Sequence, residues 1–120
     1  MGSPFVYVQL QTQDLNKAKE FYAQLFNWDL DERQTPAGPY AEILASGDKI
    51  GGIVGHRDKA ASPHWVPYVR VTDINATAEK ARALGATVLQ GPIQLPDKTW
   101  FCLIVDTTGA TFGLHQPASG

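Results

Sequence analysis

Few side chains in this sequence could carry acid, base or nucleophilic chemistry. The three histidines, His56, His64 and His115, show no H-x-H or H-x-x-x-H spacing, so they do not form a recognisable metal motif. The one cysteine, Cys102, lies in the apolar run "WFCLIV" with no base beside it, which favours a packed thiol over a nucleophile. Glu42, in "YAEILA", would stand among apolar and aromatic residues, a setting suited to proton transfer. The candidate catalytic groups are therefore Glu42, His56 and His115.

The composition excludes several classes of function. The chain has 120 residues, of which 43% are hydrophobic and 18% charged, enough for one core but not for two independent ones. A net charge of −2, with Lys and Arg scattered singly, favours neither nucleic acid nor an anionic membrane as a partner. No apolar run approaches the roughly 20 residues that cross a bilayer. A single cysteine and the lack of an export leader predict a cytoplasmic protein.

A duplicated helix organises the chain around these groups. The stretches "QDLNKAKEFYAQLF" (13–26) and "TDINATAEKARALG" (72–85) superimpose when the chain is shifted by 59 residues, which places Asp14 over Asp73. Each aspartate predicts a helix N-cap, because its carboxylate can accept a backbone N–H and meets the positive end of the helix dipole. The apolar spacing that follows is typical of an amphipathic helix, and Gly85 suits the left-handed residue that ends the second one.

Strand patterns surround the two helices in the same order. In the first half they cover 5–11, 28–34, 40–45 and 49–55, and in the second half 65–71, 86–90, 100–105 and 110–116. The sequence therefore predicts a single domain, 1–120, of two βαβββ modules (4–55 and 65–116) joined by an exposed linker (56–64). Because neither module is large enough to be stable alone, we expect them to pair, within the chain or between chains.

The quoted residues resemble a known family. "VQLQTQDLNKAKEFYAQLFNW", "GGI", "VPYVRVTDINATAEKARALGATVLQGP" and "DTTGATFGL" are similar to the vicinal oxygen chelate superfamily, which includes glyoxalase I, bleomycin resistance proteins, fosfomycin resistance enzymes and extradiol dioxygenases. The resemblance covers nearly the whole chain. It implies the α+β glyoxalase/bleomycin resistance-like fold, in which the curled mixed sheets of two tandem βαβββ modules form a cleft. It also implies a homodimer.

The resemblance implies four metal-ligand positions, and in this sequence they fall on Tyr7, Gly52, Val66 and Gly113. Metal enzymes of the family use imidazole or carboxylate groups there, whereas valine and glycine have no donor atom and a neutral phenol is a poor one. We therefore expect no metal ion and no other cofactor. Glycine at positions 52 and 113 predicts open space on the floor of the cleft, with room for a ligand.

Strand alternation predicts which side chains line the cleft. Beside Tyr7 and the two glycines, the expected ligand-binding residues are aromatic, amide or charged: Gln9, Gln11, Tyr40, Glu42, Tyr68, Arg70, Trp100 and His115. In the strand 100–105, Phe101, Leu103 and Val105 look like the better core face. Trp100, with Cys102 and Ile104, is therefore assigned to the cleft.

Three functions remain open. The first is a metal-free protein that binds a small, partly aromatic molecule by stacking and hydrogen bonds. The second is a lyase or isomerase of the same superfamily, either metal-free or with a relocated metal site on Glu42 and His56 or His115. The third is a regulatory or partner-binding module whose cleft is filled by its own side chains.

Overall fold

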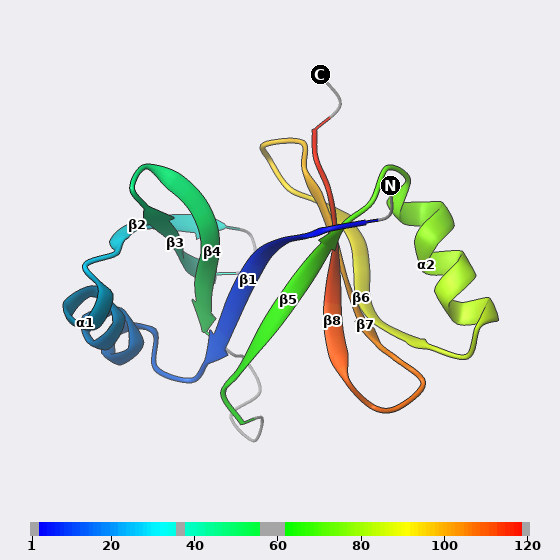
Figure 1. Cartoon of the computed structure of the whole chain (residues 1–120), viewed down its shortest axis with the longest axis horizontal. Helices are drawn as coiled ribbons and strands as arrows, with labels where there is room; N and C mark the ends of the chain where they lie inside the picture. Colours follow the sequence, from blue (N-terminus) through cyan, green and yellow to red (C-terminus); the bar gives the residue numbers. More distant parts are fainter. Residues whose placement is uncertain (1–2, 36–37, 56–61, 119–120) are drawn as a thin grey trace. The chain divides into compact units, whose positions relative to one another are not determined.

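The computed structural model describes residues 3–35, 38–55 and 62–118 (Figure 1). The order of elements is βαβββ twice, which confirms the predicted α+β fold with two modules. The first module consists of β1 (Phe5–Thr12), α1 (Leu15–Phe26), β2 (Asp29–Thr35), β3 (Gly38–Ala45) and β4 (Asp48–Gly55). The second consists of β5 (His64–Arg70), α2 (Ile74–Ala83), β6 (Thr87–Gln94), β7 (Trp100–Val105) and β8 (Thr111–Gln116).

The chain divides into two compact units that follow the modules closely. The first unit is Tyr7–Val66, and the second unit contains the rest of the chain, with the amino-terminal residues as far as Val6. The strand order is β2-β3-β4-β1 in the first unit and β5-β8-β7-β6 in the second. In each, the first and last strands of the module are parallel neighbours and the remaining pairs are antiparallel.

Both helices are short and begin in the same way. Asp14 Oδ1 accepts a hydrogen bond from the Lys17 backbone N–H, and Asp73 Oδ1 accepts one from Ala76, each at 3.0 Å. The predicted N-caps are therefore confirmed, and Gly85 has the left-handed φ of +100° expected after α2. Within the described residues, no helix is long and apolar enough to cross a membrane.

The core of the first unit lies between its sheet and α1. Alternate residues of β1, β3 and β4 form it: Leu10, Ala41, Ile43 and Ile53. Side chains of α1 and of the segment after it pack against this cluster: Leu15, Ala18, Tyr22, Trp28 and Leu30. Because strand side chains alternate, the neighbouring positions on these strands face the other side of the sheet.

The core of the second unit corrects one prediction. It consists of Val71, Ile74, Ala78, Cys102, Ile104 and Leu114. Trp100 packs against this cluster, so its side chain lies on the α2 side of β7 and not on the predicted cleft face. The register gives the reason, because the antiparallel pairing sets Cys102 opposite Leu114 and Ile104 opposite Phe112, and paired residues share a face.

Candidate functional site

The sheet face of the first unit that points away from α1 carries most of the predicted ligand-binding residues. The register places Gln9 and Glu42 on either side of Gly52, on the strands flanking β4. Gln11 lies two residues beyond Gln9, and its Nε2 donates to Gln9 Oε1 at 3.1 Å. Tyr40 lies two residues before Glu42, on the same face. Three adjacent strands thus bring amide, carboxylate and phenol groups around one glycine.

Gly52 is covered by two tyrosines. A Cβ atom at this position would overlap with the ring and hydroxyl of Tyr40 and with the hydroxyl of Tyr7. The sequence predicted open space here, and that prediction is wrong, because the missing side chain lets the tyrosines lie directly on the strand. The face therefore presents two phenol groups at the position where the resemblance implies a metal ligand.

Glu42 is the buried charge of this face, with 7% of its surface exposed. Its Oε2 lies 3.2 Å from Lys49 Nζ, and its Oε1 lies 3.6 Å from Arg33 Nη2. Arg33 also contacts Asp31, at 3.0 Å. The two acidic and two basic side chains of this ion-paired group therefore carry no net charge together.

The sequence interpretation missed Asp31, Arg33 and Lys49. The β2–β3 hairpin sets Asp31 opposite Glu42 and Arg33 opposite Tyr40. The charge alternation in "DLDERQ" carried this signal, since residues two apart in a strand share a face. Lys49 reaches the carboxylate across an irregular register near the end of β3, which no spacing in the sequence indicates.

The second unit carries its own group of predicted residues, around Tyr68, Gly113 and His115. The parallel pairing of β5 and β8 sets Tyr68 opposite Gly113 and Arg70 opposite His115. The Tyr68 ring covers Gly113 and is 3% exposed, so this glycine is filled as well. Burial raises the pKa of Tyr68 far above its ordinary value, with a smaller contribution from Cys102, and the phenol stays protonated.

The surroundings of His115 displace the pKa of its imidazole. Burial lowers the pKa of His115 below its ordinary value, while nearby Asp97 opposes this shift and Arg70 adds to it. Its Nδ1 is buried and has no hydrogen-bond partner among the described residues. The imidazole is therefore held in its neutral form, in which one ring nitrogen is able to accept a proton.

We expect His115 to make the stability of the protein depend on pH. The unfolded imidazole binds a proton near pH 6.5, whereas the folded one does so only at a lower pH, so the free energy of unfolding falls as the pH drops below about 6.5. Urea unfolding at pH 7.5 and 5.5 should show a smaller loss in His115→Gln than in the wild type. The exposed His64 supplies a control, and a His64→Gln variant with the same reduced loss would contradict this role of His115.

The remaining candidates lie away from these faces or outside the described structure. His56 falls in the 56–61 stretch, which lies outside the described residues. His64 is exposed, and its Nδ1 lies 2.8 Å from the Ser62 carbonyl oxygen. Cys102 is fully buried in the core, and burial raises the pKa of its thiol against a smaller opposing effect of Arg82. A protonated, inaccessible thiol is unsuited to nucleophilic chemistry.

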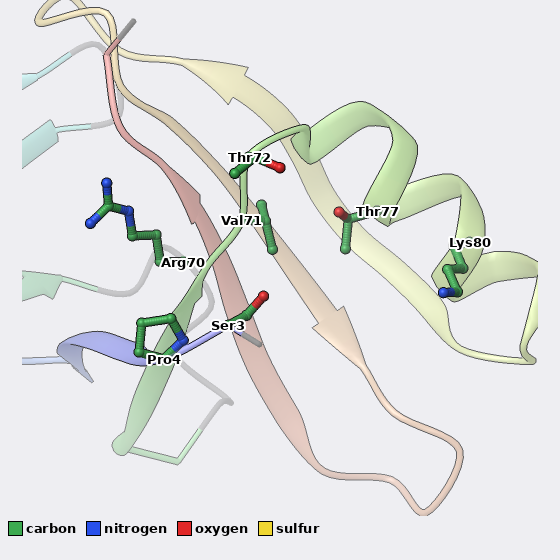
Figure 2. A pocket seen from close by; sticks show the side chains of 7 residues that line it. All are labelled: Ser3, Pro4, Arg70, Val71, Thr72, Thr77 and Lys80. Carbon is green, nitrogen blue, oxygen red and sulfur yellow. The ribbon is translucent and has the colours of Figure 1, made fainter. Parts of the chain in front are cut away.

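An open hollow in the second unit does not gather the charges that an anion site would need (Figure 2). It is lined by Ser3, Pro4, Arg70, Val71, Thr72, Thr77 and Lys80. Figure 2 shows the Arg70 side chain pointing away from Thr72 and Thr77, with Lys80 farther along α2. The two cations do not converge, so we place the candidate site on the sheet face around Gly52.

The four positions implied by the resemblance do not fit a metal ion. Gly52 and Gly113 have no donor atom and lie beneath tyrosine side chains, and Val66 is an apolar side chain with no exposed surface. Only the Tyr7 phenol remains, and phenol oxygen is a poor substitute for imidazole or carboxylate. In the described parts of the chain, no three His, Cys, Asp or Glu side chains are grouped as metal ligands would be.

The chain belongs to a recognised class of protein. The family model described as "Glyoxalase/Bleomycin resistance protein/Dioxygenase superfamily" matches residues 5–114, and the chain belongs to this superfamily. The chain is 32% identical over 115 residues to "Putative glyoxylase CFP32" of Mycobacterium bovis and of Mycobacterium tuberculosis. The match covers 92% of this chain and 44% of the relative in each case, so the chain spans less than half of their length.

Solved structures share the fold at low sequence identity. Methylmalonyl-CoA epimerase from Mycobacterium tuberculosis is 18% identical, with a TM-score of 0.70 over 98% of this chain and 89% of the epimerase. A hypothetical protein from Bacillus halodurans is 9% identical, with a TM-score of 0.74 over 100% of this chain and 98% of its own. At these identities the likeness establishes the fold, and the function rests on the residues of the site.

Proposed function

We propose that the chain binds a small, partly aromatic molecule on the face around Gly52, without a metal ion. The observation that carries this proposal is the convergence of Tyr7, Tyr40 and Glu42 at one glycine. Aromatic rings on a sheet are often only packing. Here, however, the two phenol groups lie over a glycine that is paired with Glu42, at the position where the resemblance implies a metal ligand.

The chemistry of this face favours a neutral, planar ligand with hydrogen-bonding groups. Tyrosine rings supply stacking surface, and their hydroxyls can donate or accept. The Glu42 carboxylate accepts only, and its ion pairs with Arg33 and Lys49 hold it in place. The positive charges of Arg33 and Lys49 balance the negative charges of the acidic groups beside them. A charged ligand would therefore gain little electrostatic attraction at this group and would lose its hydration.

Three probes of similar shape and different charge test whether the site prefers a neutral ligand. Benzamide is neutral, benzoate carries a negative charge and benzamidine a positive one. We expect benzamide to perturb the amide NMR signals of Gly52, Tyr40 and Glu42 at millimolar concentration, with weaker effects from the two ions. Glu42→Gln should weaken benzamide binding about 10-fold, since it replaces a charged acceptor oxygen by an NH₂ group that only donates, and Tyr40→Phe should weaken it about 5-fold, since it removes a hydroxyl from the site.

A matched control distinguishes the site from general electrostatics. Glu32 is also ion-paired, to Lys19 at 2.8 Å, and Glu32→Gln should leave benzamide binding unchanged. Equal binding by the wild type, Glu42→Gln and Tyr40→Phe would refute the assignment of the site. Stoichiometric zinc, nickel, manganese or iron in the purified protein would refute its metal-free character.

A metal-free isomerase or lyase is a second candidate, and His115 is the observation that favours it. A neutral imidazole in a partly buried setting is a suitable general base for removing a proton next to a carbonyl group. Methylmalonyl-CoA, named for the epimerases of similar fold, is a direct probe. Deuterium uptake from D₂O into this compound, lost in His115→Gln and retained in His64→Gln, would favour this function over simple binding.

A further inference from the structure

The groups around Gly52 divide into hydrogen-bond donors and a hydrogen-bond acceptor. The Glu42 carboxylate only accepts, whereas the phenol hydroxyls of Tyr7 and Tyr40 can each donate one hydrogen bond while accepting others. The register sets Glu42 directly opposite Gly52, and the two hydroxyls lie over this glycine. Directly opposite positions on paired strands have their Cβ atoms about 4.5–5.5 Å apart, so the donors and the acceptor can contact adjacent atoms of one small ligand.

The two hydroxyls converge on one point. Both oxygen atoms lie within 2.5 Å of the position that a Cβ atom on Gly52 would occupy, so they are at most about 5 Å apart. Two O–H donors that share an acceptor, each at about 2.7 Å, can be separated by up to about 5.4 Å. The Tyr7 and Tyr40 hydroxyls are therefore close enough to hold a single oxygen atom between them. A carbonyl oxygen, with its two lone pairs, is suited to this position.

Glu42 has one carboxylate oxygen that is held and one that can accept a further hydrogen bond. Its Oε2 lies 3.2 Å from Lys49 Nζ, whereas its Oε1 lies 3.6 Å from Arg33 Nη2, which is longer than a hydrogen bond. Arg33 Nη2 lies closer to Asp31, at 3.0 Å from Oδ2. The carboxylate is thus fixed through Oε2, and Oε1 is able to accept a hydrogen bond from an N–H group of a ligand.

We propose that the ligand of this face is a planar ring with a carbonyl oxygen next to an N–H group, as in a lactam or a cyclic imide. This ligand class rests on the proposed function, because it requires the ligand to lie over Gly52. The carbonyl oxygen accepts from the hydroxyls of Tyr7 and Tyr40, and the N–H donates to Glu42 Oε1. In a ring these two groups are cis and point the same way, whereas an open-chain secondary amide must leave its preferred trans form to present both.

Three bicyclic compounds of nearly equal shape test this ligand class. Isocarbostyril is a lactam with both the carbonyl and the N–H, isocoumarin has a ring oxygen in place of the N–H, and N-methylisocarbostyril has a methyl group in place of the hydrogen. In an NMR titration of the full chain, we expect isocarbostyril to bind at least 10-fold more tightly than either of the other two. This is the loss expected when a hydrogen bond to a charged group cannot form.

Two variants assign each hydrogen bond to its residue. Glu42→Gln should weaken the binding of isocarbostyril about 10-fold and leave that of isocoumarin unchanged, because only the lactam donates to the carboxylate. Tyr7→Phe keeps the ring and removes the hydroxyl, so it should weaken both compounds about 5-fold, since both carry the carbonyl. Glu32→Gln is the matched control, because Glu32 is ion-paired to Lys19 at 2.8 Å, and it should change neither affinity.

Benzamide separates a failure of the lactam assignment from a failure of the binding face. Benzamide binding at Gly52 combined with equal affinities for isocarbostyril and isocoumarin would overturn the lactam assignment and leave the face in place. An equal loss of both compounds in Glu42→Gln would overturn it in the same way. If none of these compounds binds, benzamide included, both the face and the ligand class are refuted.

Discussion

Replacing Gly51 by alanine is expected to lower the free energy of unfolding by about 3 kcal/mol, the upper part of the range for overpacking. Gly51 lies opposite Val8 in the parallel β1–β4 pair, and an added Cβ atom would overlap with the Val8 carbonyl oxygen. That oxygen belongs to the backbone, so no side-chain rotation can relieve the overlap. The two strands would have to separate, and hydrogen bonds between them would be lost.

Two other glycines of β4 serve as controls within the same strand. At Gly55 an added Cβ atom meets nothing within 4 Å, so Gly55→Ala should change the free energy of unfolding by less than about 0.5 kcal/mol. At Gly52 it meets the mobile ends of tyrosine side chains, and the effect of Gly52→Ala should fall between the other two. Urea unfolding of the three variants measures the series. Equal stability of Gly51→Ala and Gly55→Ala would contradict the close approach of the strands.

The Tyr68–Gly113 contact predicts strong coupling between two substitutions. Tyr68→Ala removes a buried ring and should cost about 3–5 kcal/mol, as other large-to-small core changes do. Gly113→Val should cost about 2 kcal/mol, because its side chain would overlap with that ring. In the double variant valine partly fills the space left by tyrosine. We therefore expect its loss to be at least 1 kcal/mol smaller than the sum of the single losses.

Tyr68→Phe is the control for this cycle, since it keeps the ring and removes only the hydroxyl. Its combination with Gly113→Val should be additive, because the overlap with the ring remains. Denaturant unfolding of the variants gives the coupling free energies. Additive losses in Tyr68→Ala with Gly113→Val would mean that the ring does not occupy the space above Gly113.

Local sequence signals predicted the order of the helices and strands. Asp14 and Asp73 each satisfy a backbone N–H of the next turn, and a capping aspartate followed by helical apolar spacing is legible in sequence. The duplication of this pattern then fixed the order of both modules. Superfamily membership followed from the same residues, and the family model matches 5–114.

The face assignment of β7 failed because it compared residues within one strand. Phe101, Leu103 and Val105 are together at least as apolar as Trp100, Cys102 and Ile104, so hydrophobicity alone could not choose between them. The turn around 106–109 sets the register between β7 and β8, and this register decides which face is buried. It pairs Val105 with Thr111, and counting outward brings Cys102 to Leu114, which lies in the core.

The content of the candidate site depended on long-range geometry. A sequence shows that Gly52 and Gly113 lack side chains, but not that Tyr40 and Tyr68 turn over them. It likewise shows the charge of Glu42 without the ion pair that Lys49 makes across the hairpin. Ligand binding at these residues, the homodimer and the regulatory alternative stay predictions.

The tyrosines above Gly52 and Gly113 also constrain how this protein can evolve. A lineage that gained a carboxylate at Gly52 would first meet the overlap with Tyr40 and Tyr7, and one at Gly113 would meet Tyr68. Each step toward the type of metal site that the resemblance implies thus lowers stability until a second residue changes. In a marginally stable domain such intermediates are selected against. The glycine–tyrosine pairs therefore require two changes, at the glycine and at the tyrosine above it, before a carboxylate can stand at either position.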